Sequence, residues 1–460
     1  MDQKPNVILI TIDALRPGHL GFMGYKGNTS PNIDNFAKES IVFKNAFSVG
    51  PTTPYSFPSI LTSTYPLDFQ GPAEIKKPRV LISEVFKKNG YATAAFHSSP
   101  YLSEYFGYNK GWDFFQDIHF SEYQKENKFS AFLRIGKRIF NKYAILFFPG
   151  IFFQLVYLRY RIEGPKKNKT RAGYVNKIVK DFLYSIKGKG RPFFIWIHYM
   201  DVHTPPLCYQ KGQTCSYGEL IGDCAGAAIW AYGNKGALKR FVRKKLKKYL
   251  PEILLSYEKA IQFLDNELGN LLNFFKKQNI YENSIICLSS DHGDEFLEHG
   301  GMGHNIQLYN EVLSVPLMIK IPGESNSADA EVKKKISLID LAPTLCKLAG
   351  IEPPPSFKGK SLFDRLAKDD GFIFHQSAFS EKKGWQLDIE KKEQCRIACQ
   401  NDNFKYIMDY RTGGEEFYNL SNDPHEKKEI SKNNPEALLK FRKKVGEFEK
   451  INPILSWKQS

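Results

Sequence analysis

Two segments near opposite ends of the chain each lead an apolar run directly into a carboxylate. Residues 6–12 (NVILITI) precede Asp13, and residues 285–290 (IICLSS) precede Asp291 and His292. Short apolar runs bounded by turn residues are typical of buried strands, and α/β proteins place their chemistry at the carboxyl ends of parallel strands. Two carboxylates and an imidazole form a suitable donor set for a divalent metal ion. We therefore predict that Asp13, Asp291 and His292 bind one cation.

A hydroxyl-rich segment lies between these carboxylates in sequence. Residues 50–66 (GPTTPYSFPSILTSTYP) combine threonine, serine and proline, and Pro58 suits the first turn of a helix. The free N–H groups and the dipole at a helix N-terminus favour anions. A cation beside such a hydroxyl neutralises the oxygens of an anionic ester and activates the attacking group. The residues therefore predict a metal-dependent ester hydrolase with a covalent enzyme intermediate.

A third apolar run, residues 193–198 (FFIWIH), is followed by Asp201 and His203. His203 should project into the same rim as the metal ligands, because it follows the end of a predicted strand. Its imidazole could contact the transferred group or protonate the leaving oxygen, since the ordinary pKa of histidine is about 6.5. His198 lies inside the apolar run, where an isolated histidine is more typical of a satisfied core residue.

The apolar runs alternate with helical patterns along the chain. Strands are predicted at 6–12, 91–96, 192–199, 284–289 and 315–321, and helices at 33–40, 81–89, 252–277 and 340–349. This alternation predicts an α/β fold with a mostly parallel central sheet sandwiched by helices. After a triple proline at 353–355 the pattern changes to short strands and a lysine-rich terminal helix. We expect a catalytic domain over 1–369 and a smaller α+β subdomain over 370–460.

Several motifs, taken in order, resemble the sulfatase branch of the alkaline phosphatase superfamily. They are IDALRPGHLG (12–21), LTSTYP (61–66), FFIWIHYMDVHTPP (193–206), SSDHGDEFLEHG (289–300), VPLMIKIPG (315–323), DLAPTLCKLAGI (340–351), FKGKSL (357–362) and EEFYNLSNDPHEKKEI (415–430). The resemblance runs over nearly the whole chain. It implies an alkaline phosphatase-like sheet, a second, smaller antiparallel sheet, and metal-dependent hydrolysis of sulfate esters.

The register of this resemblance places Thr53 at the nucleophile position, with Thr52 and Ser56 as close alternatives. Typical sulfatases have Cys or Ser there, within a C/S-x-P-x-R signature, and oxidise it to formylglycine. This chain has Tyr55 in place of the Pro and Phe57 in place of the Arg. A Thr cannot be converted to formylglycine, whereas Thr nucleophiles occur in phosphodiesterase and phosphomutase branches. The alternatives are therefore a phosphodiesterase or phosphonate hydrolase, a phospho-group transferase, or an inactive binding module.

The resemblance also implies further site residues. It adds Thr53 to the predicted metal ligands, and it places His304 and His97 among the substrate-binding residues together with His203. One divalent cation is expected. Two carboxylates and an imidazole fit Mn²⁺, Zn²⁺ or Mg²⁺, whereas the family resemblance favours Ca²⁺, which prefers an all-oxygen shell.

The net charge of +16 suits an anionic ester substrate, including an acidic glycan or a lipid-linked ester. No nucleic-acid-binding signature is present, so a nucleic acid is not an expected partner. An insertion at about 120–170 carries an aromatic stretch, 144–158, that is too short for a bilayer span of about 20 residues. It is either a packed insertion or a peripheral membrane contact.

The chain enters its first strand by Val7, which predicts a cytoplasmic protein without a signal peptide. An odd count of seven cysteines fits reduced thiols, although Cys395 and Cys399 could pair.

Overall fold

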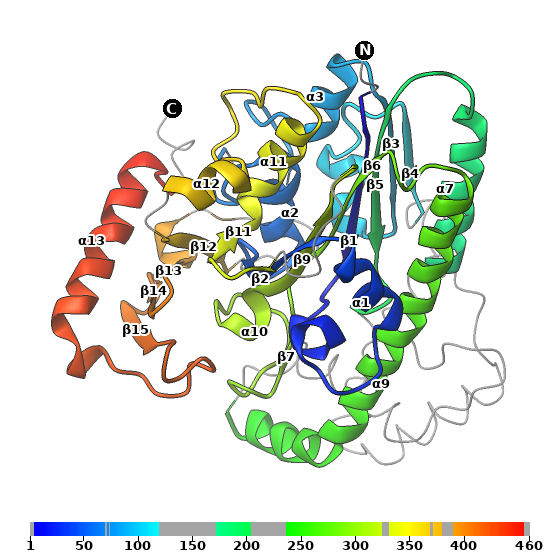
Figure 1. Ribbon diagram of the computed structural model, residues 1–460. Coiled ribbons are helices and arrows are strands. Elements are labelled where there is room, and N and C mark those ends of the chain that lie inside the picture. The colour runs from blue at the N-terminus through cyan, green and yellow to red at the C-terminus, as the bar shows by residue number, and fades with distance from the viewer. Residues whose placement is uncertain are drawn as a thin grey trace, which may run out of the picture.

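The computed structural model describes residues 4–69, 71–72, 74–118, 172–203, 236–323, 331–368, 371–379, 389 and 391–454. The larger part of the molecule is built on a nine-stranded sheet with the order β10-β2-β9-β6-β1-β5-β3-β4, and β11 pairs with β2 (Figure 1). The strands are β1 (Asn6–Ile12), β2 (Ile41–Phe47), β3 (Ala92–His97), β4 (Phe114–Asp117), β5 (Phe193–Tyr199), β6 (Ser284–Ser290), β9 (Ser314–Lys320), β10 (Glu331–Val332) and β11 (Ile336–Ser337).

The central strand β1 is parallel to both of its neighbours, with Val7 opposite Phe194 of β5 and Ile285 of β6. β9 runs antiparallel to both β6 and β2. The predicted α/β fold with a mostly parallel sheet is therefore confirmed, with one antiparallel strand inside it. Because β1, β5 and β6 are parallel and in register, the residues that follow them meet at one edge.

Alternate residues of β1 enter two separate cores, as the two-residue period of a strand requires. Ile8 and Ile10 pack with α1 (Pro31–Lys38), α7 (Ala172–Ile186) and α9 (Gly236–Lys277). Val7 and Leu9 pack with α2 (Thr53–Thr62), α3 (Ile82–Lys88) and α11 (Leu341–Leu348). These two helical layers lie on opposite faces of the sheet (Figure 1).

Two helices differ from their predicted limits. α9 begins at Gly236 rather than near 252, so the basic run at 239–248 belongs to it. α2 begins at Thr53, with Pro54 in its first turn, and Pro58 lies inside the helix. The expectation that Pro58 marks the helix start was wrong. Its missing N–H leaves one internal hydrogen bond of this short helix unmade.

A second, four-stranded antiparallel sheet follows in the order β12-β13-β14-β15. Its elements are β12 (Ile373–Ala378), β13 (Cys395–Gln400), β14 (Phe404–Asp409), β15 (Gly414–Asn419) and the covering helix α13 (Pro435–Ile451). Phe441 of α13 packs edge-on against Phe417 of β15 at 5.3 Å between ring centroids. This sheet lies beside the α2 side of the large sheet (Figure 1).

Cys395 and Cys399 are both buried free thiols on β13, so the suggested pairing was wrong. Four residues along a strand span about 13 Å, whereas a disulfide requires Cα atoms less than about 7 Å apart. Among the described helices, none is both long and apolar enough to cross a bilayer. The segment 144–158 lies outside the described residues.

Candidate active site

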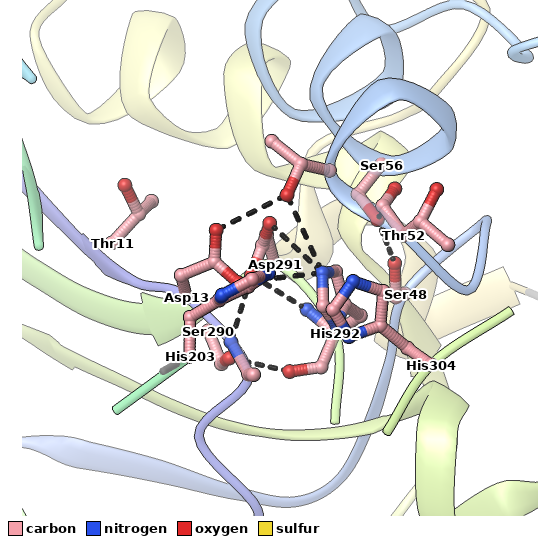
Figure 2. Close-up of polar contacts among 12 residues, drawn as sticks. Thr11, Asp13, Ser48, Thr52, Ser56, His203, Ser290, Asp291, His292 and His304 are labelled. Carbon is pink, nitrogen blue, oxygen red and sulfur yellow. Dashed lines mark hydrogen bonds and ion pairs between the residues drawn. The ribbon is translucent and has the colours of Figure 1, made fainter. Parts of the chain in front are cut away.

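Asp13, Asp291 and His292 meet at the carboxyl edge of the central strands. Each follows β1 or β6 directly, and each is fully buried. The N–H of Asp13 donates to the carbonyl of Tyr199 at the end of β5, at 2.9 Å, which extends the sheet bonding into the site. Figure 2 shows the three side chains pointing toward one another.

The atoms of these residues that could bind a metal ion face a common point. His292 Nε2 lies 3.5 Å from Asp13 Oδ1 and 3.5 Å from Asp291 Oδ2. His292 Nδ1 lies 2.9 Å from the carbonyl oxygen of Gly293, which only accepts, so Nδ1 carries the hydrogen and Nε2 keeps its lone pair. When two neighbouring ligand atoms each lie about 2.1 Å from one ion, they are about 3 to 3.5 Å from each other. The spacing fits a single cation.

Two of these atoms also lack a hydrogen-bond partner. Asp13 Oδ1 and Asp291 Oδ2 are buried and make no hydrogen bond in the described part of the chain. Buried polar atoms are nearly always satisfied in folded proteins, and an unsatisfied pair of carboxylate oxygens calls for a ligand. The donor set therefore fits a divalent metal ion.

The electrostatics of the site point the same way. Burial acts to raise the pKa of Asp13, but His203, His198 and His292 outweigh it and hold that pKa well below its ordinary value. Burial and the neighbouring Asp13 charge raise the pKa of Asp291 well above its ordinary value. Burial lowers the pKa of His292 to about 3, so its imidazole is neutral and able to bind a metal. A cation would relieve the repulsion between the two carboxylates.

Thr53, the first residue of α2, presents its hydroxyl to this group. Thr53 Oγ1 donates to Asp13 Oδ2 at 3.1 Å and lies 3.4 Å from His292 Nε2. Ser56 Oγ instead lies 2.9 Å from Ser48 Oγ and donates to the carbonyl of Gly50. Thr52 is the extended N-cap residue of the helix. Of the three candidate nucleophiles, the geometry favours Thr53.

Comparison with protein-family models identifies the family of this chain. A protein-family model described as Sulfatase matches residues 5–351, and one described as N-sulphoglucosamine sulphohydrolase, C-terminal, matches residues 298–449. The chain belongs to the sulfatase family. This is a family of sulfuric ester hydrolases, and its members generally bind a divalent metal.

Individual sulfatases are distant relatives of this chain. An arylsulfatase of Clostridium perfringens is 25% identical and covers 92% of this chain and 89% of its own. An iduronate 2-sulfatase of Mus musculus is 26% identical and covers 76% of this chain and 69% of its own. The solved phosphonate monoester hydrolase of Agrobacterium radiobacter has a TM-score of 0.69 at 17% identity, covering 97% of this chain and 96% of its own, which shows a shared fold.

In this sulfatase, two histidines lie beside the predicted metal ligands. His203 Nε2 lies 3.9 Å from Asp13 Oδ1, and the rings of His203 and His304 are 4.9 Å apart. Both side chains are partly exposed, at 28% and 19%, so a substrate can reach them. Figure 2 shows His304 on the same side as His292.

The pKa values of the two histidines shift in opposite directions, and Asp294, which the sequence prediction missed, accounts for the rise at His304. His304 Nδ1 lies 2.7 Å from Asp294 Oδ1. Burial acts to lower the pKa of His304, but Asp294 outweighs it and raises that pKa. Burial lowers the pKa of His203, more than Asp13 raises it. The position of Asp294, two residues after His292 in the same motif, was the available signal.

The other polar residues considered for the site make contacts within the protein. His97 is buried and stacks on Trp196, with ring centroids 5.7 Å apart, so a substrate contact by His97 stays a prediction. The carboxylate of Asp201 accepts from the N–H of Ala172 at 3.1 Å, at the start of α7. His299 uses both ring nitrogens in contacts with the protein itself.

His299, together with Glu295 and Glu311, forms a second acidic and imidazole group. His299 Nδ1 lies 2.5 Å from Glu311 Oε1, and Nε2 lies 2.9 Å from the carbonyl of Glu426. The carbonyl accepts, so Nε2 carries a hydrogen and cannot bind a metal. His299 therefore joins the turn between β7 (Glu295–Phe296) and β8 (Met302–Gly303) to the loop after β15.

Proposed function

We propose that this chain hydrolyses a sulfate ester, with Thr53 as the nucleophile and one divalent cation held by Asp13, Asp291, His292 and Thr53. The observation that carries the proposal is the Thr53 hydroxyl, 3.1 Å from Asp13 Oδ2 and beside the free Nε2 of His292. When bound, the cation would neutralise the non-bridging ester oxygens and favour the alkoxide form of the hydroxyl. Its donors suit Mn²⁺, Zn²⁺ or Mg²⁺ better than Ca²⁺.

The first step transfers the sulfuryl group to the enzyme. Thr53 Oγ1 forms a bond to sulfur, its hydrogen passes to Asp13 Oδ2, and the bond from sulfur to the leaving oxygen breaks. The leaving oxygen takes a proton from a histidine. Because burial holds the pKa of His203 low while Asp294 raises that of His304, we assign this proton to His304 instead of the expected donor His203.

The second step restores the enzyme. Water attacks the sulfur of the sulfated Thr53 and gives up a proton to the neutral His203, and this proton then passes to His304, whose ring lies 4.9 Å away and which gave its own proton to the leaving oxygen. The bond between sulfur and Oγ1 breaks, sulfate leaves, and Oγ1 takes back the hydrogen held by Asp13. This route needs no oxidised residue.

A phosphate-type reaction is the second candidate, because the same threonine at position 53 is compatible with transfer of a phosphoryl or phosphonyl group. The structural likeness to a phosphonate monoester hydrolase supports only a shared fold. We also propose that the natural substrate is a sulfated sugar, an interpretation supported by the relative named for iduronate and by the net charge of +16.

The test compares four aryl esters with the metal-loaded protein: sulfate, phosphate monoester, phosphodiester and phosphonate. Thr53→Ala should lose at least about 1,000-fold in kcat/KM on the preferred ester, because neither of the other two candidate nucleophiles, Thr52 and Ser56, presents its hydroxyl to the cation ligands. Thr53→Ser retains the hydroxyl and should keep measurable turnover. Ser59→Ala, on the same helix, is the matched control and should keep the proposed nucleophile in place, because its hydroxyl donates to the carbonyl of Thr64 beyond the opposite end of α2.

Each outcome has a distinct meaning. A dominant sulfate signal lost in Thr53→Ala, with a sulfated Thr53 peptide found by mass spectrometry, supports the proposal. Dominant hydrolysis of a phosphate or phosphonate ester would favour the second candidate function. Silence on all four esters, with sulfated oligosaccharides also unchanged, would favour a non-catalytic binding protein.

A further inference from the structure

Three buried side chains form a line of hydrogen bonds behind Asp13. Trp196 Nε1 donates to Thr11 Oγ1 at 3.0 Å, and Thr11 Oγ1 lies 2.9 Å from His198 Nδ1. His198 Nε2 then lies 3.5 Å from Asp13 Oδ2. Thr11 and His198 are direct partners across the parallel strands β1 and β5, and all three side chains are fully buried. The line therefore runs through the rigid centre of the sheet to the site.

The chemistry of each group sets the direction of the line. An indole nitrogen only donates, so Thr11 Oγ1 accepts from Trp196 and keeps its own hydrogen to give. Two acceptors are near: His198 Nδ1 at 2.9 Å and the carbonyl of Ile197 at 3.4 Å. The shorter contact favours His198. With Nδ1 accepting, the ring hydrogen of His198 must be on Nε2, the atom that faces Asp13.

This direction divides the Asp13 carboxylate between two tasks. Oδ2 accepts from Thr53 at 3.1 Å and faces the N–H of His198. Oδ1 makes no hydrogen bond and faces His292 Nε2 at 3.5 Å. A donor on the Oδ2 side holds the carboxylate rotated so that Oδ1 remains free. Residues that orient metal ligands in this way commonly change metal affinity when replaced.

We propose that His198 is a positioning residue that donates from Nε2 to Asp13 Oδ2, with its tautomer set by the hydroxyl of Thr11. It is not itself a metal ligand, because the same hydrogen occupies the nitrogen nearest the site. The consequence for metal affinity rests on the proposed function, whereas the tautomer does not.

The first experiment measures the tautomer in metal-free protein. Long-range ¹H–¹⁵N spectra of ¹⁵N-histidine-labelled protein in a chelator should show His198 with its hydrogen on Nε2, assigned by the signal lost in His198→Gln. Thr11→Val keeps the shape but removes the hydroxyl, and should shift His198 toward a mixture of tautomers, whereas Thr11→Ser should preserve it. Hydrogen on Nδ1 in the unchanged protein would overturn the proposal.

The second experiment uses Zn²⁺ alone as the probe, titrated calorimetrically into two matched variants. The amide nitrogen of Gln takes the place of Nε2, so His198→Gln should bind Zn²⁺ within about 3-fold of the unchanged protein. The amide of Asn takes the place of Nδ1 and leaves Asp13 without its donor, so His198→Asn should bind about 10- to 100-fold more weakly. Equal affinities for the two variants, or a Zn²⁺-induced shift typical of coordination at His198 Nε2, would contradict the positioning role.

The two experiments separate this proposal from the proposed function. If the unchanged protein fails to bind any divalent cation, the proposed metal-dependent function is wrong. The tautomer of His198 still tests whether its Nε2 donates to Asp13. If His198→Asn does not fold, the Thr11→Val and Thr11→Ser pair provides the same comparison without altering the imidazole.

Discussion

Replacing Asp291 with Asn should stabilise the metal-free protein while removing its metal affinity. Asp291 Oδ1 accepts from the N–H groups of His292 and Ala14, at 2.9 and 3.3 Å, and an Asn oxygen can keep both contacts. What the substitution removes is a buried negative charge next to Asp13. Burial and that neighbouring charge raise the pKa of Asp291, so the folded, metal-free protein resists ionising it.

The sign of the pH dependence follows from the proton count. Between the ordinary pKa of 3.8 and the raised pKa, folded Asp291 keeps a proton that the unfolded chain has released. Folding stability therefore falls as pH rises through this window, by about 1.4 kcal/mol per pH unit for one proton. Above the raised pKa the loss is complete. The Asn variant has no such loss, so its advantage should grow with pH and then become constant.

The assay is urea unfolding of both proteins in a chelator at several pH values from 5 to 8, followed by the same series with saturating Zn²⁺. In the chelator, Asp291→Asn should be the more stable protein at pH 8. With metal at 100 times its dissociation constant, the unchanged protein gains about 2.7 kcal/mol and the variant gains nothing, so the advantage of the variant should shrink by that amount. An advantage that does not change with pH in the chelator would refute the reasoning.

Asp13→Asn provides the opposite control at the same site. His203, His198 and His292 hold the pKa of Asp13 below its ordinary value despite burial, so its ionised form stabilises the fold above that ordinary value. Asp13→Asn should therefore destabilise the metal-free protein as well as remove metal affinity. Two ligands of one ion would then have opposite effects on the metal-free protein.

Three further predictions concern the surroundings of the site. Gly293→Ala should weaken Zn²⁺ binding in calorimetry and cost about 1 to 3 kcal/mol in urea unfolding, because its Cβ would lie 2.3 Å from the carbonyl oxygen of Glu311. Lys405→Met should cost about 3 to 5 kcal/mol, since it leaves the fully buried Glu426 without its partner at 2.7 Å, whereas the double variant with Glu426→Gln should recover most of that loss. Tyr55→Phe should cost about 1 kcal/mol by thermal unfolding, because its hydroxyl donates to a main-chain carbonyl of β12 at 2.8 Å.

The sequence predicts the parts of the fold that have local signals. The central strands and the carboxylates that follow them were placed correctly, because an apolar run and its end can be recognised within a few residues. The antiparallel strand β9 was predicted as a strand, but its direction depends on partners far apart in sequence, β2 and β6. The first part of α9 was missed although Leu238, Phe241, Leu246 and Leu250 recur at helical spacing, because the basic run around them was interpreted only for its charge.

The site divides in the same way. Asp13, Asp291 and His292 follow strands directly, so their meeting at one edge could be expected. The roles of His198 and Asp294 depend on which atoms face each other across the packed sheet, and no spacing in the sequence records that. The cytoplasmic location and the membrane contact through 144–158 stay predictions.

The small sheet contacts the segment that leads to the proposed nucleophile, although none of its residues was predicted to belong to the site. The side chain of Gln400 donates to His375 Nε2 at 3.0 Å, and His375 Nδ1 donates to the carbonyl of Ser48 at 2.7 Å. The N–H of Gln376 donates to the carbonyl of Val49 at 2.8 Å. Burial lowers the pKa of His375 to about 3, so this directed line persists without a change of charge across the neutral range.

These bonds fix the segment that enters α2, only a few residues before Thr53. A boundary near residue 370 therefore separates two sheets but does not separate the chemistry from its support. A chain ending at 369 would contain every proposed metal ligand and the proposed nucleophile, yet the main-chain carbonyls of residues 48 and 49 would lose the two donors that hold them in place. Because a displacement of about 1 Å at a reacting group can cost about 100-fold in rate, we expect a chain without the small sheet to lose turnover on that scale even though it keeps the proposed ligands.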